Sequence, residues 1–516
     1  MTIPAIPPSA PQAKFTPPAN NLVSLGDSIT AYHWYGQNIT SASRSAGVAT
    51  IVSSSHQAIN GQKMLICGFS DTSFNGFPTI TRVDANTITY PNPGPDVGSA
   101  SITNAQIRNP YWQFDVGYLS WARPASKNRV NLLYNAGIPG DTTNGMLARL
   151  QSDVFSYSPN YVSVMGGIND LTSSTPVATV FANLQSIYRQ CRQRGIRVFA
   201  LTVLPLETGH PSYSLAVQEA ICSLNALIRQ ECKSQPSMIL VDAFSVVVDP
   251  LSASCQPLTG YLQTDHIHPS ARGAKAIGEL LASSFNSVMP LVNGLISSGA
   301  DNRAIGIVNS NFWPSLPSVP TGGTINNGTA HMTGVAPSGF DIRTSVGNPT
   351  SAVASAPART ILANGDTIGY NARCVFQAAA NGDQIKITQS SSAWALTPAS
   401  GGSAVSIGNA YILEFALDIT GIANANIKEI FAFLNFTIDG NIYRSKILSA
   451  SDTTFPITDI VGYVCQTPAF FLTGASITAM SIELDVTAGG AASSPVTIDM
   501  GRVSVREFPA GSVLNF

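Results

Sequence analysis

A serine, an aspartate and a histidine in this chain have the types and spacing that nucleophilic acyl transfer requires. Ser28 stands in Gly-Asp-Ser-Ile-Thr, where the apolar run 22–25 ends. Far downstream, Asp265 and His268 lie three residues apart in Asp-His-Ile-His-Pro. A serine hydroxyl is a poor nucleophile until a neutral imidazole accepts its proton, and the imidazole needs a partner on its other nitrogen to fix its tautomer. Residues at i and i+3 can share one face of a turn, so Asp265 can orient His268.

Four sequence blocks, each weak by itself, follow one another in a specific order. They begin at Gly26 (Gly-Asp-Ser-Ile-Thr), Asn135 (Asn-Ala-Gly-Ile-Pro-Gly-Asp-Thr), Gly167 (Gly-Ile-Asn-Asp) and Asp265 (Asp-His-Ile-His-Pro). In this combination the chain resembles the SGNH (GDSL-type) hydrolase family, whose blocks supply Ser, Gly, Asn and His in this order. The resemblance covers about residues 20–290. It implies a flavodoxin-like, three-layer α/β/α fold.

The resemblance also implies a role for each block. Ser28 resembles the family's nucleophile, His268 its base, and Asp265 the group that orients the base. Gly140 and Asn169 resemble the oxyanion donors, acting together with the Ser28 backbone amide. Preorganised donors of this kind contribute about 2.7–4 kcal/mol each. Glycine at position 140 lets the backbone come close to a substrate.

Several neighbouring polar residues have plainer interpretations. His266 competes with His268 for the role of base, but the i,i+3 spacing and the family block favour His268. Asp27, Asp141 and Asp170 each follow a predicted tight turn, where a carboxylate commonly caps a helix or braces a loop. We expect a structural role for these three carboxylates.

An aromatic cluster follows the predicted nucleophile. Tyr32, His33 and Trp34 could stack on a sugar ring and are the candidate substrate-binding residues. Packing of these side chains in the core around the first helix explains them equally well.

Composition and charge exclude several classes of function. Only 11% of the 516 residues are charged and the net charge is −2, so we expect no nucleic-acid partner and no basic membrane-binding surface. The seven cysteines are scattered without a Cys-x-x-Cys pair, and we expect mostly buried thiols. The six histidines include no His-x-x-x-His, so no metal or other cofactor is expected. No apolar stretch is long enough for a membrane helix.

The hydrophobic pattern divides the chain into three parts. Residues 1–20 are rich in proline and alanine, do not resemble a Sec signal peptide, and predict a connecting arm. Residues 21–299 alternate short apolar runs with amphipathic stretches, which predicts a parallel sheet covered on both faces. Its expected strands are 22–26, 130–134, 161–165, 197–204 and 238–241. Short β-like runs between about 47 and 107 predict a small β insertion beside the site.

Residues 300–516 lose the helical periodicity. Strict alternation at 411–419 and 480–486, and an Asp439-Gly440 hairpin signal, predict a separate, jelly-roll-like β-sandwich. Phe312, Trp313 and Trp394 fit sugar binding, although core or interface packing is the favoured explanation. This part is therefore expected to bind carbohydrate or to support oligomerisation.

These observations predict a serine esterase that removes small acyl groups, acetyl foremost, from a polysaccharide such as a capsule or O-antigen glycan. Two alternatives stay open: a polysaccharide-binding or structural module with a vestigial site, and a lipase or thioesterase. The overall architecture also resembles phage tail-spike or tail-fibre esterases. By analogy we expect an extracellular or virion-associated protein, without membrane insertion, that can form a homotrimer.

Overall fold

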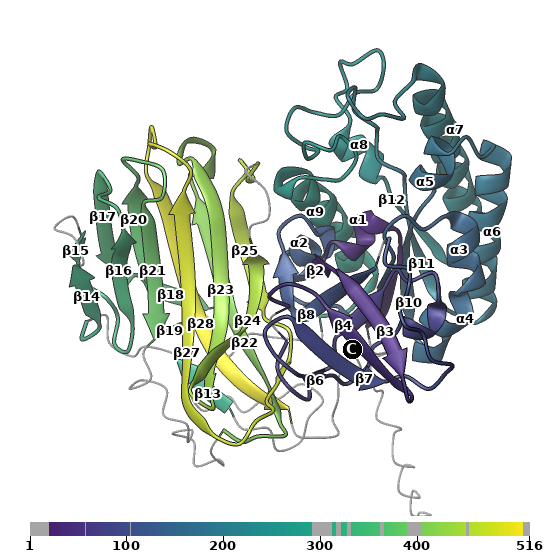
Figure 1. The fold of residues 1–516 in the computed structure, drawn as a ribbon. Helices are drawn as coiled ribbons and strands as arrows, with labels where there is room; N and C mark the ends of the chain where they lie inside the picture. Colours follow the sequence, from purple (N-terminus) through teal and green to yellow (C-terminus); the bar gives the residue numbers. More distant parts are fainter. Residues whose placement is uncertain are drawn as a thin grey trace, which may run out of the picture.

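The computed structural model shows an α/β domain joined to a β-rich C-terminal domain (Figure 1). It describes residues 20–56, 58–103, 105–291, 312–315, 321–327, 332–361, 366–389, 405–449 and 454–508. Trp394 and all but the last residue of the expected N-terminal arm lie outside these ranges.

The central sheet of the α/β domain has five parallel strands in the order β12-β11-β10-β1-β9. In chain order this is 2-1-3-4-5, the flavodoxin-like arrangement, so the predicted fold class is confirmed. The strands are nearly continuous apolar runs because both faces of the sheet are covered. Their bounds are β1 (Asn21–Gly26), β9 (Asn131–Gly137), β10 (Tyr161–Met165), β11 (Arg197–Leu201) and β12 (Met238–Val241).

Helices form the two outer layers of this domain. Helix α9 contacts α2 and α8 on one side, and α6 contacts α3 and α7 on the other (Figure 1). None of the described helices is both long enough and apolar enough to cross a bilayer. The helices are α1 (Ser28–Ala31), α2 (Tyr118–Ala125), α3 (Thr143–Ala148), α4 (Leu150–Asp153), α5 (Ile168–Thr172), α6 (Val177–Gln193), α7 (Leu215–Ser234), α8 (Ala243–Val247) and α9 (Ala271–Val288).

The β insertion is larger than the limits 47 and 107 predicted from sequence. It begins with β2 immediately after the first helix and ends with β8. Four of its strands form a small sheet in the order β3-β4-β7-β6. The strands are β2 (Trp34–Asn38), β3 (Ser41–Ser45), β4 (Val48–Val52), β5 (Leu65–Cys67), β6 (Thr81–Arg82), β7 (Thr87–Pro91) and β8 (Gln106–Phe114).

Two large sheets make up the C-terminal domain and share one apolar core. The alternating residues of 411–419 and 480–486 point into this core, as their spacing predicts. One sheet has the order β15-β17-β20-β28-β22-β25, with β13 and β26 beside it, and the other has the order β14-β16-β21-β27-β23-β24.

The strands of this domain run from β13 to β28. Their bounds are β13 (Phe312–Ser315), β14 (Thr324–Asn327), β15 (Met332–Gly334), β16 (Asp341–Val346), β17 (Ser351–Ser355), β18 (Ala358–Ile361), β19 (Asp366–Tyr370), β20 (Ala372–Gln377), β21 (Gln384–Gln389), β22 (Ala410–Thr420), β23 (Ile427–Ile438), β24 (Asn441–Ser449), β25 (Ile460–Gln466), β26 (Phe470–Phe471), β27 (Ile477–Ala488) and β28 (Val496–Phe508).

The C-terminal domain is not physically separate, contrary to the expectation from sequence. Its second sheet continues from β24 onto β8 of the insertion, with Lys446 paired to Trp112, and ends at β2. Lys275 of α9 donates hydrogen bonds to Thr458 Oγ1 (2.7 Å) and to the backbone oxygen of Asp459. The strand that follows Ser28 is thus tied, through β2 and β8, to the C-terminal sheet.

Candidate active site

Ser28 is the first residue of α1, just beyond the carboxyl end of β1. The residue is 8% exposed. The turn is tight because Gly26 leaves no room for a side chain: a Cβ there would lie 2.7 Å from the carbonyl oxygen of Met165. Asp27 caps α1 by accepting a hydrogen bond from the Ile29 N–H (3.0 Å). This turn holds the serine at the edge of the sheet where α/β proteins bind ligands.

His268 contacts Ser28, although the two residues lie near opposite ends of the domain's sequence. Its Nε2 lies 2.7 Å from Ser28 Oγ, although the two residues are 240 positions apart. Its Nδ1 lies 2.6 Å from Asp265 Oδ2. The other carboxylate oxygen of Asp265 accepts hydrogen bonds from the backbone N–H groups of Ile267 (3.2 Å) and His268 (3.1 Å). The three side chains that the sequence singles out therefore form one hydrogen-bonded series.

The environment of Asp265 keeps this carboxylate ionised. Partial burial by itself would raise its pKa, but the hydrogen bond from the His268 ring, the charge of that ring and the two backbone N–H donors lower the pKa to about 2. An ionised carboxylate at this place orients the imidazole and stabilises its protonated form.

Gly140 lies in the loop after β9, and Asn169 lies on α5, which follows β10. Both strands pair with β1 up to Gly26, so these two segments leave the sheet next to the turn of Ser28. Gly140 has a φ of +77°, a left-handed conformation that favours glycine, and its backbone N–H has no hydrogen-bond partner among the described residues. Asn169 Nδ2 donates one hydrogen bond to the backbone oxygen of Asp141 (2.9 Å). An amide nitrogen carries two hydrogens, so this bond fixes the Asn169 side chain and leaves a second N–H for a ligand.

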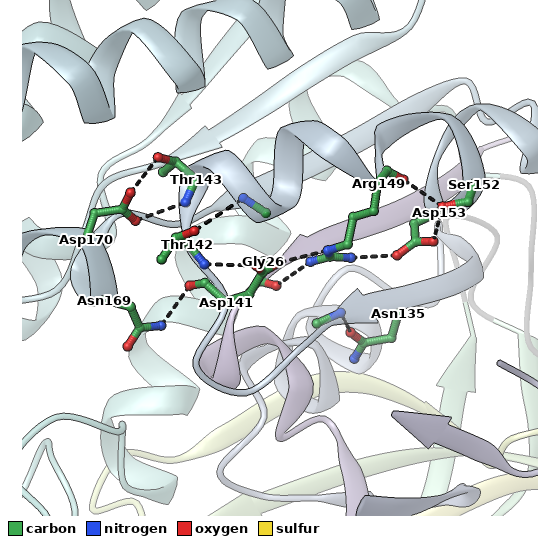
Figure 2. A network of polar contacts seen from close by, with 12 residues as sticks. Gly26, Asn135, Asp141, Thr142, Thr143, Arg149, Ser152, Asp153, Asn169 and Asp170 are labelled. Carbon is green, nitrogen blue, oxygen red and sulfur yellow. Dashed lines mark hydrogen bonds and ion pairs between the residues drawn. The ribbon is translucent and has the colours of Figure 1, made fainter. Parts of the chain in front are cut away.

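A polar network ties these loops together (Figure 2). Asp141 accepts from Arg149 Nε at 2.7 Å, and Arg149 Nη2 donates to the backbone oxygen of Gly26 at 2.9 Å. Asp170 accepts from both the backbone N–H and the hydroxyl of Thr143 (2.9 and 2.7 Å). Asp141 and Asp170 therefore brace turns, and Asp27 caps a helix. These are the structural roles expected from the sequence for the three carboxylates.

The substrate-binding role predicted for the aromatic residues after the serine needs a correction. His33 is completely buried and its Nδ1 lies 2.9 Å from Ser120 Oγ, while Trp34 is 4% exposed and begins β2. Neither side chain is accessible to a substrate, so core packing, the other explanation offered from the sequence, holds for both. Only Tyr32 remains at the site: its ring centre is 4.5 Å from that of His268.

One contact at the site was not foreseen. Glu207, in the loop between β11 and α7, binds His266 Nδ1 through Oε2 at 2.8 Å. His266 is therefore engaged elsewhere, and His268 alone reaches Ser28. No sequence signal marks Glu207, because it lies 59 residues from its partner in an irregular segment. Among the described residues, no group of three or more His, Cys, Asp or Glu side chains could hold a metal ion.

Comparison with known proteins relates the α/β domain to a family. Residues 101–276 match the model of the GDSL-like lipase/acylhydrolase family. The α/β domain belongs to this family. The matched segment of this acylhydrolase domain contains Gly140, Asn169, Asp265 and His268, whereas Ser28 lies before it, on the other side of the β insertion.

Individual relatives of this GDSL-like domain are distant. The uncharacterised lipoprotein YqeF of Bacillus subtilis is 31% identical over 99 residues, which are 18% of this chain and 40% of that protein, so the chain spans less than half of that relative's length. A lipase/acylhydrolase from Enterococcus faecalis is similar over 53% of this chain and all of its own, with 18% identity and a TM-score of 0.32. A variant of an acetyl-xylooligosaccharide esterase from Geobacillus is similar over 52% of this chain and 94% of its own, with 16% identity and a TM-score of 0.32.

Proposed function

We propose that this protein is a serine esterase that removes small acyl groups, acetyl foremost, from a polysaccharide. The observation that carries the proposal is the hydrogen-bonded series from Ser28 Oγ through His268 to Asp265, with distances of 2.7 and 2.6 Å. It occurs in a domain of an acylhydrolase family, which supports ester hydrolysis.

The geometry supports a two-step mechanism. His268 Nε2 takes the hydroxyl proton while Ser28 Oγ attacks the ester carbonyl carbon. The negative charge that develops on the carbonyl oxygen faces the backbone N–H groups of Ser28 and Gly140 and the free N–H of Asn169. His268 then gives its proton to the departing sugar oxygen, and a water molecule, activated by the same imidazole, hydrolyses the acyl-enzyme.

A polysaccharide substrate is the finer part of the proposal. The low overall charge fits a neutral or weakly acidic glycan. The continuous sheet from β24 through β8 to β2 would hold a long substrate's binding surface and the catalytic turn in one fixed arrangement. The homotrimer and the virion or extracellular location stay predictions from the sequence.

Hydrolysis of p-nitrophenyl acetate and butyrate tests the esterase. The wild type should hydrolyse acetate faster than butyrate, and Ser28→Ala should lose turnover of both. Ser283→Ala, which removes an exposed hydroxyl on α9, is the matched control and should keep full activity. A preference that rises with acyl length would instead indicate a lipase or thioesterase, and glycan binding without any turnover would indicate a vestigial site. Release of acetate from acetylated polysaccharides, absent in Ser28→Ala, then tests the substrate.

A further inference from the structure

Two cysteines of the α/β domain face each other without being bonded. Cys222 lies on α7 and Cys255 in the loop between α8 and the Asp265 turn, and their sulfur atoms are 3.7 Å apart. Both are partly exposed, whereas four of the other five cysteines are buried. A disulfide requires a separation of about 2.05 Å, so the two sulfurs are already in contact. We propose that Cys222 and Cys255 form a disulfide under oxidising conditions and thereby fasten the loop 249–257 to α7.

The backbone around Cys255 is already held against the helix. Gln218, one turn before Cys222 on α7, donates from Nε2 to the backbone oxygen of Cys255 at 2.6 Å. The same side chain accepts a hydrogen bond from the Leu206 N–H at 3.1 Å. These contacts hold the Cys255 backbone against α7, so disulfide formation would need only a local adjustment of the two cysteine side chains and the loop.

The loop that would be fastened supports the candidate active site. Gln256, next to Cys255, accepts hydrogen bonds from the backbone N–H and the hydroxyl of Thr208 (2.8 and 2.7 Å). Thr208 follows Glu207, which binds His266 in the turn that carries Asp265 and His268. The cross-link would thus stabilise the segments that hold the turn of Asp265 and His268. It would not contact the side chains that take part in the reaction.

The chemistry needs a disulfide oxidant, for which we take oxidised glutathione. One cysteine thiolate attacks the glutathione disulfide and releases one glutathione thiolate; the second cysteine attacks the mixed disulfide and releases the other. The protein loses two protons and two electrons, and oxidised glutathione becomes two molecules of glutathione. Burial and the contact with Cys255 raise the pKa of Cys222 to about 11, so the reaction should accelerate between pH 7 and 9 as thiolate forms.

Peptide mapping of the full chain tests the cross-link. After incubation with oxidised glutathione at pH 8.5 and alkylation of the remaining thiols, the wild type should yield a peptide linked through Cys222 and Cys255. Cys222→Ser and Cys255→Ser should not yield it. Cys232→Ser is the matched control, because Cys232 is also partly exposed on α7, and this variant should still form the link. A wild type without the linked peptide, or one that links Cys232 instead, would overturn the proposal.

Thermal unfolding tests whether the link fastens the loop. The oxidised wild type should unfold about 5–10 °C above its reduced form, a difference that should vanish in Cys255→Ser. Equal midpoints for the oxidised and reduced protein would show that the cross-link adds nothing to the stability of this region. Neither measurement uses ester hydrolysis, so the result stands apart from the proposed function.

Discussion

Glu207 holds His266 in an unusual backbone conformation next to the catalytic candidates. Its carboxylate binds the imidazole at 2.8 Å, and its backbone N–H donates to the carbonyl oxygen of His266 at 3.1 Å. His266 has a φ of +66°, in the left-handed region where residues other than glycine are strained. Two contacts from Glu207 therefore support the turn on which Asp265 and His268 meet.

Loss of the Glu207 side chain should weaken catalysis without changing substrate affinity. In Glu207→Ala only the backbone hydrogen bond between residue 207 and His266 remains of this contact, and we expect kcat to fall about 2- to 10-fold, the equivalent of about 0.5–1.5 kcal/mol for one hydrogen bond. Glu207→Gln keeps an acceptor oxygen for His266 and should retain most of the rate. Steady-state kinetics with p-nitrophenyl acetate measure both. Equal rates for Glu207→Ala and the wild type would mean that the turn does not depend on this contact.

Asp265→Asn should be far more damaging than its small change in shape suggests. The oxygen of asparagine would stay with the backbone N–H groups of Ile267 and His268, and its NH₂ group would face His268 Nδ1. The ring would then carry its proton on Nε2 and could not accept one from Ser28. We expect kcat to fall about 10⁴-fold, with thermal stability close to that of the wild type. A loss below tenfold would show that Asp265 does not set the tautomer.

Asn169→Ala should lower kcat about 10²- to 10³-fold with little effect on KM, because a donor to the oxyanion acts mainly in the transition state. The variant also loses the hydrogen bond to the Asp141 backbone oxygen, so a structural control is needed. Asn183→Ala serves this purpose: Asn183 donates to Thr143 Oγ1 in the same network, from helix α6. If both variants lose the same activity, Asn169 acts through the network and not as a donor.

The parts of the fold that follow from local periodicity could be predicted from sequence. The parallel sheet covered on both faces follows from alternating strands and helices, whereas its flavodoxin-like strand order was implied by the resemblance to the SGNH family. The Asp439-Gly440 turn does join β23 to β24, with both residues at positive φ. Pairing between distant segments could not be foreseen. The parallel pairing of β24 with β8 joins residues more than 300 positions apart, and no local pattern encodes such a partner.

In the candidate active site, too, some residues could be predicted from the sequence and others could not. Ser28, Asp265 and His268 stand in short blocks whose residue types and spacing indicate their chemistry from the sequence alone. Trp34 was a candidate for sugar stacking because it closely follows the serine, whereas α1 ends at Ala31, the chain enters β2 and the Trp34 side chain is buried, as the packing explanation had it. Glu207 was missed because its function comes only from its three-dimensional partner.

Asp27 should make the folded protein less stable as pH rises, whereas most carboxylates have the opposite effect. Burial raises the pKa of Asp27 to about 7 despite the hydrogen bond from Ile29, and its Oδ2 has no hydrogen-bond partner among the described residues. The folded protein thus holds this proton more tightly than the unfolded chain, so the free energy of unfolding falls as pH rises from about 4 through 7. Asp27→Asn keeps the cap on α1 and removes the titration.

Urea unfolding of the wild type and Asp27→Asn at several pH values between 4 and 8 measures this effect. The variant should gain stability relative to the wild type as pH rises, by at most about 4 kcal/mol for three pKa units. Asp84→Asn is the control of opposite sign, because backbone hydrogen bonds from Asn86 and Thr87 lower the pKa of this exposed carboxylate, and its removal should give no such gain. Wild-type and Asp27→Asn curves that stay parallel over this range would mean that Asp27 does not titrate there, and the buried carboxylate beside Ser28 would have to be ionised throughout.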